Sequence, residues 1–272
     1  MTSDEDTGRT TATARPTNAA RPRRSALDRV TAMQLAATEY ERYGDLLADL
    51  TPADWSAPTD CPGWDVRTMA AHNLGMARMA TSFAEMIRQQ AKADRRSRKS
   101  GEALVDALTA IQVAERTSLT PAEIVADYRR TGPRAARGRR RRPGWFRHAR
   151  LPGAQRVNGA DEPWTFGFVI DTILTRDCWM HRVDTGRATG RDPVLTADHD
   201  GIIVADVVAE WSSRYRPAGT LVLTGPAGGT WTFPDPGDMI TIDAVEFCRI
   251  LSGRPATRDA DAAVLGGSEV PF

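Results

Sequence analysis

Apolar residues in the first part of the chain recur at steps of three or four, the spacing of one face of an amphipathic helix. The first stripe covers residues 27–47, and Ser25 before it is a candidate N-cap. A second stripe runs from Val66 to Ile87. It follows a CPGW loop with a Pro-Gly break, and Asp65 is its candidate cap. The pattern therefore predicts two long helices joined by a loop.

Three more helical stretches follow in the sequence. Shorter helices are predicted over residues 103–115 and 121–130. A longer one is predicted over residues 165–187, ending at Gly186 or Gly190, because glycine readily takes the left-handed conformation that closes helices. Together these elements predict a helical bundle that ends at about residue 190.

The character of the chain changes after Pro193. Three short runs rich in β-branched or aromatic residues are separated by Gly and Pro, which is typical of strands: GTLVLTG, GTWTF and DMITID. The GPAGG segment (225–229) lacks the strand and helix context of a phosphate loop and is predicted to be a hairpin turn. Helices are predicted on either side of these strands, over residues 197–214 and 244–251.

These elements predict a mainly α protein with three segments. Residues 1–24 are rich in Thr, Ala, Arg and Pro without apolar periodicity, and we expect a disordered tail. Residues 25–192 form the predicted bundle, and residues 193–272 form a smaller α+β domain.

Charge and cysteine content narrow the class of protein. The net charge of +1 gives no global attraction to nucleic acid or acidic membranes, and no window is apolar enough for a membrane span. Three well-separated cysteines and the lack of a signal peptide favour a reducing cytoplasm over a disulfide framework.

One segment is strongly basic although the whole chain has a net charge near zero. Residues 129–150 contain ten arginines with early Gly and Pro residues, and we interpret them as a connection outside the core. Trp145 and Phe146 beside the arginines would suit stacking on a single strand, so nucleic-acid contact is a third functional hypothesis. An arginine-rich loop is more commonly just solvated, which makes nucleic acid an unlikely partner.

The residues with the clearest chemistry are Asp177 and His181. Four residues apart on a helix, they project about 40° apart around its axis and can hold one ion between them. His72, on another predicted helix, would add a second imidazole. Two imidazoles and a carboxylate suit zinc, leave one position open for catalysis, and can be built inside a bundle. The alternatives are a surface Asp–His salt bridge and a partly buried His72 with a hydrogen-bond partner.

Other polar and aromatic residues have simpler interpretations. Asp184 is either a helix-end charge or a partner that orients His181. His148 and His199 are predicted to lie on the surface, and Cys61 is predicted to pack within its loop. Three tryptophans are predicted to belong to the core: Trp55, Trp64 and Trp179.

The chain resembles the mycothiol-dependent maleylpyruvate isomerase family in four stretches: PTDCPGWDVRTMAAHNLGM (58–76), TRDCWMHRVDTGRATGR (175–191), TGPAGGTWTF (224–233) and DAVEFCRILSGR (243–254). The resemblance implies an N-terminal DinB-like four-helix bundle and a C-terminal domain similar to sterol carrier proteins. It also implies zinc bound by a histidine of the second helix and an acidic-x-x-x-His pair of the last.

The family's zinc ligands correspond to His72, Asp177 and His181, although the best-known family members carry Glu where this chain has Asp177. Asp is one methylene shorter, which puts maleylpyruvate as the particular substrate in doubt. The resemblance also implies that an arginine of the C-terminal domain holds an anionic substrate. Arg254 is our candidate for this catalytic role; the alternative is a helix C-terminal charge.

The expected function is a cytoplasmic, metal-dependent isomerase or thiol S-transferase. Mycothiol, the low-molecular-weight thiol of actinobacteria, would be the cosubstrate, and the substrate would be a small, anionic electrophile. Release of the thiol after bond rotation would make the enzyme an isomerase, and its retention would make it a transferase. The alternative is a non-catalytic binding protein whose C-terminal domain carries a small apolar ligand. No membrane partner is expected.

Overall fold

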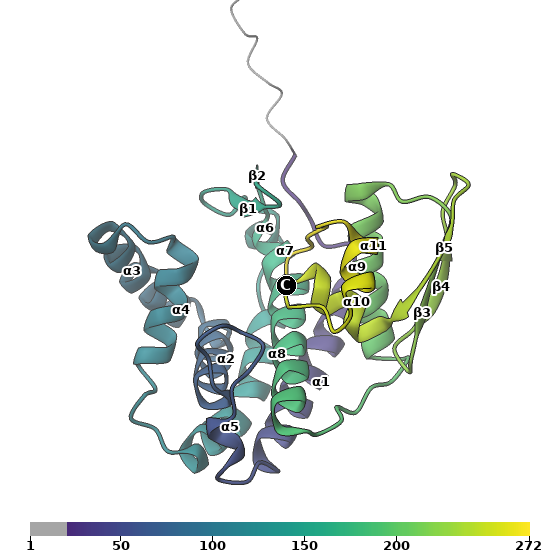
Figure 1. The fold of residues 1–272 in the computed structure, drawn as a ribbon. Coiled ribbons are helices and arrows are strands. Elements are labelled where there is room, and N and C mark those ends of the chain that lie inside the picture. Colours follow the sequence, from purple (N-terminus) through teal and green to yellow (C-terminus); the bar gives the residue numbers. More distant parts are fainter. Residues whose placement is uncertain (1–20) are drawn as a thin grey trace, which may run out of the picture.

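The computed structural model describes residues 21–272, which form a helical bundle with a smaller α+β part beside it (Figure 1). The bundle consists of α1 (Arg29–Ala48), α2 (Val66–Thr81), α5 (Pro121–Arg140) and α8 (Leu174–Thr189). Each buries an apolar side against the others, with three tyrosines among the packed side chains: Tyr40, Tyr43 and Tyr128. The mainly α class is confirmed.

Smaller elements surround the four bundle helices. The helices α3 (Phe83–Ser100) and α4 (Leu104–Ala114) pack together beside α2. The other elements of this half are the 3-10 turn Asp54–Ser56, α6 (Gly144–His148), the hairpin β1 (Gln155–Val157) and β2 (Ala160–Glu162), and α7 (Phe166–Phe168). No helix in residues 21–272 is long and apolar enough to cross a membrane.

The α+β part packs on one side of α8. It contains α9 (Asp200–Tyr215), β3 (Thr220–Thr224), β4 (Gly229–Thr232), β5 (Met239–Asp243), α10 (Ala244–Leu251) and α11 (Asp259–Leu265). The strand order is β4-β3-β5, with β3 antiparallel to β4 across the predicted hairpin turn and parallel to β5. Its core includes Trp179, Met180 and Val183 of α8. The boundaries of the two predicted domains stay a prediction.

The prediction of one helix over residues 165–187 is nearly correct. Thr165 caps α7, a π-helical turn over Val169–Ile173 leads into α8, and the helix ends at Gly190 in the left-handed conformation. Gly186 lies inside α8 instead, and an added Cβ there would meet the carbonyl oxygen of Arg191 at 2.7 Å.

Two predicted helix boundaries in the first part are wrong. The N-cap of α1 is Asp28, whose carboxylate accepts from two backbone amides of the first turn. The predicted stripe from Val66 to Ile87 is two helices, because Ser82 takes an extended conformation and its hydroxyl caps α3. Ile87 is therefore largely exposed and belongs to no core stripe.

The prediction that residues 129–150 form a connection outside the core is also wrong. The helix α5 continues to Arg140 despite Pro133, and Gly138 allows it to approach the carbonyl oxygens of Ala80 and Thr81. Arg139 is fully buried and donates to the carbonyl oxygen of Ile170 at 2.8 Å. Periodicity alone does not reveal a buried arginine, because its acceptor lies 31 residues away.

The predicted tail, residues 1–24, lies outside the described residues except for its last four. Within these, the backbone of Arg23 bonds to Pro163 and Thr165 on either side of Trp164, and its guanidinium pairs with Glu162. The prediction of a disordered tail is therefore wrong for Arg23, whose backbone is held by two hydrogen bonds.

Candidate metal centre

His72 lies in the middle of α2, on the side that faces α8. Asp65 starts this helix, as predicted, because its Oδ1 accepts from the backbone N–H of Thr68 at 2.8 Å. The side chain of His72 is only 7% exposed, and its Nδ1 has no hydrogen-bond partner among the described residues.

Asp177 and His181 meet His72 across the interface between α2 and α8. Asp177 Oδ1 lies 3.8 Å from His72 Nε2 and 3.4 Å from His181 Nε2. One ligand atom from each residue lies within 4.8 Å of the other two. Two atoms that each bind zinc at about 2.0–2.2 Å in tetrahedral geometry lie roughly 3.3–3.6 Å apart. The spacing and the donor types therefore suit one divalent ion.

The electrostatics of this cluster favour a cation. Burial raises the pKa of Asp177, but the neighbouring imidazoles of His181 and His72 hold the net pKa well below its usual range. Burial lowers the pKa of His181, and the carboxylate of Asp177 outweighs this and raises it well above 6.5. The carboxylate is thus ionised, and the positive charge that it stabilises on His181 as a proton can instead be that of a metal ion bound in place of the proton. Within residues 21–272, no arginine or lysine pairs with Asp177.

Asp184 orients His181 from the far side of the ring. Its Oδ2 lies 3.4 Å from His181 Nδ1, so the hydrogen on the imidazole can reside on Nδ1 and leave the lone pair of Nε2 directed toward Asp177. Burial raises the pKa of Asp184, and its bonds to His181 and Arg254 lower the net value below normal.

Arg254 reaches the same carboxylate from the C-terminal part. Its Nη2 lies 2.7 Å from Asp184 Oδ2, and the guanidinium is largely buried. The loop that carries Arg254 is fixed by Arg249, which donates to the carbonyl oxygen of Pro255 at 3.1 Å. Arg254 therefore lies at the edge of the cluster and is not simply a helix C-terminal charge.

The CPGW loop supplies two further side chains. The ring centroid of Trp64 is 5.3 Å from that of His72 and 6.0 Å from that of His181. Cys61 Sγ lies 3.8 Å from Asp184 Oδ2 and 3.7 Å from Arg254 Nη2. Trp64 is half-buried at the site, so its assignment to the core is wrong. The prediction that Cys61 only packs within its loop is wrong as well.

The position of this loop is held by Asp60. Its Oδ2 accepts from Arg187 of α8 at 3.1 Å and from Arg249 of α10 at 2.7 Å. One carboxylate oxygen thus connects the loop to the bundle and to the C-terminal part. The motif CPGW was the signal in the sequence that pointed to this loop, but its contacts are too distant along the chain to be read from it.

The two remaining histidines, His148 and His199, differ in their exposure to solvent. His148 is exposed, as predicted. His199 is buried, contrary to prediction, and its Nε2 lies 2.8 Å from Glu39 Oε1. Glu39, His199 and Asp200 also lie close enough to share an ion, but Arg182 pairs with both carboxylates and Arg42 pairs with Asp200. Two guanidinium groups therefore balance the two carboxylates. This second cluster is a buried ion-pair network. Trp55 and Trp179 are buried as predicted.

The fold and the cluster define a helical-bundle protein with a candidate metal centre between two bundle helices. The model of the family "Mycothiol maleylpyruvate isomerase N-terminal domain" matches residues 36–186, more than half of the chain. The chain belongs to this family, which is a family of enzymes. The family resemblance of the sequence is confirmed.

Solved structures and curated sequences give a second comparison. The fold is similar to two crystal structures of the mycothiol-dependent maleylpyruvate isomerase, one of them a variant with a histidine replaced by alanine. For each, the TM-score is 0.53 at 17% identity, covering 85% of this chain and 91% of the other. No curated protein sequence matches the chain.

Proposed function

We propose that this protein is a metal-dependent enzyme that uses mycothiol to isomerise a small anionic electrophile or to transfer the thiol to it. The observation that carries the proposal is the cluster in which His72 of α2 meets Asp177, 105 residues later in the chain, and His181 of α8. These three residues have the donor set of a zinc site. Membership of the mycothiol maleylpyruvate isomerase family supports the choice of cosubstrate.

His72, Asp177 and His181 would hold the ion. When bound, zinc would lower the pKa of the cosubstrate thiol and so make it nucleophilic at neutral pH. With the ion on Nε2, Asp184 would hold the hydrogen of His181 on Nδ1, and it also pairs with Arg254. Trp64 packs against both imidazoles and limits the access of water on that side.

Arg254 would bind a carboxylate of the substrate. Its Nε and Nη2 are directed to Asp184, while its Nη1 hydrogen-bonds, among residues 21–272, only to the carbonyl oxygen of Ser252, at 3.3 Å. The Nη1 side is therefore the one that a substrate anion would use. Asp184 is negative and would repel a substrate carboxylate on the side of Nε and Nη2. A substrate carboxylate would therefore approach Arg254 from the side of Nη1.

Metal analysis of the purified protein tests the proposal, followed by thiol conjugation assays with mycothiol and with glutathione. We expect about one divalent ion per chain, activity with mycothiol, and loss of both in His181→Ala. His148→Ala is the matched control, because that histidine is exposed and distant in sequence from the cluster. A His181→Ala protein that keeps its metal would exclude this site. A metal-free wild type would instead favour the non-catalytic binding protein.

A further inference from the structure

The exposed end of α5 carries a concentration of positive charge that the proposed function does not use. Residues 128–160 contain eleven arginines and no acidic residue. Several of these arginines are buried and structural, but five are exposed and have no acidic partner among residues 21–272. One of the five, Arg150, lies beyond α6. The other four lie together at the C-terminal end of α5: Arg134, Arg137, Arg140 and the C-cap Arg141.

An exposed tryptophan follows directly after these arginines. Trp145, on α6, is 72% exposed, although its neighbour Phe146 is buried and lies 5.8 Å from it between ring centroids. Tryptophan and arginine are the residues most enriched at the energetic centres of protein interfaces. We refer to the four arginines and Trp145 as the basic patch.

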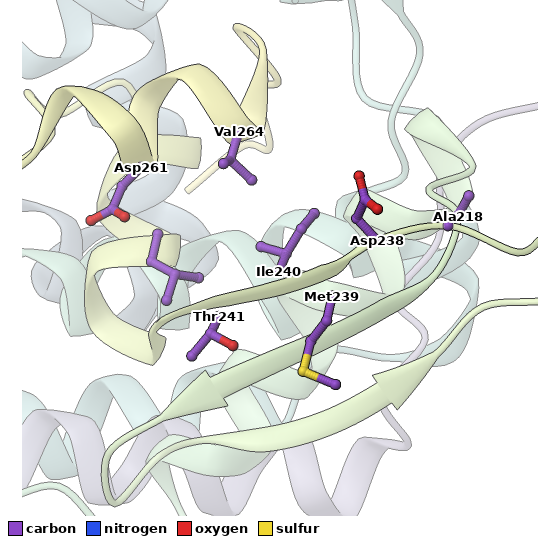
Figure 2. A pocket seen from close by; sticks show the side chains of 9 residues that line it. Ala218, Asp238, Met239, Ile240, Thr241, Asp261 and Val264 are labelled. Carbon is purple, nitrogen blue, oxygen red and sulfur yellow. The ribbon is translucent and has the colours of Figure 1, made fainter.

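A cavity of the opposite charge lies in the C-terminal part. It has a volume of about 620 Å³ and lies between β5 and α11, where Ile240 and Val264 line opposite sides (Figure 2). Met239 and Val264 at this cavity are 70% and 50% exposed. Two acidic residues line it: Asp261 pairs with Arg258, whereas Asp238 is exposed without a basic partner among the described residues. Asp235, three residues before Asp238, is exposed and also has no such partner in residues 21–272. We refer to this site as the acidic cavity.

The charge difference extends beyond the basic patch and the acidic cavity to the segments that carry them. Residues 193–272 carry five arginines and eleven acidic residues, so that part of the chain is strongly negative although the whole chain has a net charge of +1. A long polyanion such as a nucleic acid, or an anionic bilayer, would be attracted by the basic patch but repelled by the C-terminal part. A second copy of this chain presents both surfaces.

We propose that the basic patch of one copy docks into the acidic cavity of a second copy, with Trp145 entering between β5 and α11. The helices α5 and α6 belong to the bundle, whereas β5 lies at the right edge of the view in Figure 1, with α9 and α10 between it and the bundle. The two surfaces of one molecule therefore do not meet each other, and the contact is head-to-tail. Such contacts extend to further copies unless a ring closes.

The test uses analytical ultracentrifugation of the full chain over a range of concentrations and salt. We expect the wild type to associate at low ionic strength and to dissociate as the screening length falls from about 10 Å at 0.1 M salt to about 3 Å at 1 M. A basic-patch variant, Arg134→Glu with Arg137→Glu and Arg141→Glu, and a cavity variant, Asp235→Lys with Asp238→Lys, should each remain monomeric. Arg95→Glu is the control, an exposed arginine of α3 outside the patch.

A mixture of the two variants gives the decisive measurement. The basic-patch variant keeps its acidic cavity and the cavity variant keeps its basic patch, so an equimolar mixture should form a 1:1 heterodimer that grows no further. Trp145→Ala should weaken the wild-type association at least ten-fold. Each of three results would overturn the proposal: a wild type that is monomeric at every concentration, self-association that survives in either variant, or a mixture that does not pair. A monomeric wild type that binds an oligonucleotide or anionic vesicles would identify the other occupant of the patch.

Discussion

Arg254 and Asp184 form a buried ion pair, with Nη2 2.7 Å from Oδ2, that joins the C-terminal loop to α8. The same carboxylate oxygen lies 3.4 Å from His181 Nδ1, on the opposite side of that ring from Asp177. The arginine proposed to bind substrate is therefore connected through one carboxylate to a proposed metal ligand. Substitutions at either residue should affect both functions.

For Arg254, we expect Arg254→Lys to lower kcat/KM for an anionic substrate at least ten-fold, because lysine keeps the charge but loses the planar fork that binds carboxylates. The measurement compares this loss with the loss for an uncharged ester of the same substrate. An equal loss for both would mean that Arg254 acts only by supporting Asp184.

For Asp177, the two close substitutions should differ in their effect on metal content. Asp177→Glu keeps the charge and the oxygen donor, so the ion should remain bound, while Asp177→Asn supplies a neutral and weaker ligand and should lose most of it. Metal content and thermal stability of the two variants would be measured side by side. If Asn equals wild type in both, Asp177 is no ligand, because a simple salt-bridge partner contributes only about 0–1 kcal/mol.

For the buried arginine of α5, we expect Arg139→Met to lower the free energy of unfolding by about 2–3 kcal/mol, because the carbonyl oxygen of Ile170 and the hydroxyl of Thr175 lose a charged donor. Urea unfolding measures the change. Arg137→Met is the control two residues away; its side chain is exposed, and the change should stay within about 0.5 kcal/mol. Similar losses in both variants would contradict the assigned role of Arg139.

Acid should loosen the contact between α8 and α9. Burial raises the pKa values of Asp200 and Glu210, but Arg182 and Arg176 outweigh this and hold both below normal. The unfolded pKa values are near 3.8 for Asp200 and 4.5 for Glu210. A carboxylate whose pKa is lower in the folded protein stabilises the fold fully above the unfolded pKa. This stabilisation is lost as the pH falls from the unfolded pKa through the folded pKa. The melting temperature should therefore fall steeply below about pH 4. Asp200→Asn should make the fall in melting temperature less steep. A melting temperature with the same pH dependence as wild type would contradict the role assigned to the Asp200–Arg182 pair.

Two N-terminal deletions should differ in their effect on stability, because only one of them removes Arg23. Deleting residues 1–20, which have no apolar periodicity, should leave the melting temperature and metal content unchanged. Deleting residues 1–24 also removes the bonds of Arg23 to the strand-like segment around Trp164 and should cost about 1–2 kcal/mol. Equal effects of the two deletions would contradict this boundary.

The local signals of the sequence predicted the helices well. Apolar periodicity located most of α1, α2, α4 and α8, and the glycine and β-branched pattern located β3 to β5. Ser82 is a good N-cap residue, but apolar positions at helical spacing continued past it, so the break between α2 and α3 was missed.

The candidate site was only partly visible in the sequence. The spacing of Asp177 and His181 indicated a shared metal ion, and His72 on another predicted helix offered a third ligand. The family resemblance supported this set and added Arg254. The positions of Cys61 and Trp64 depend on Asp60, which contacts arginines more than a hundred residues away. His199 and Arg139 were assigned to the surface because a charged or polar residue is normally exposed, and their buried partners are not local in sequence.

The helix α8 has consequences for the modularity of the protein. Leu174 and Cys178 belong to the core of the bundle, whereas Trp179, Met180 and Val183 belong to the core of the C-terminal part, and the proposed ligands lie on the same helix. A chain divided after α8 would leave a tryptophan and two aliphatic side chains without cover, and the C-terminal fragment would lack part of its own core. The two halves are therefore poor candidates for exchange by recombination, and a new C-terminal partner would have to be acquired together with matching changes in α8.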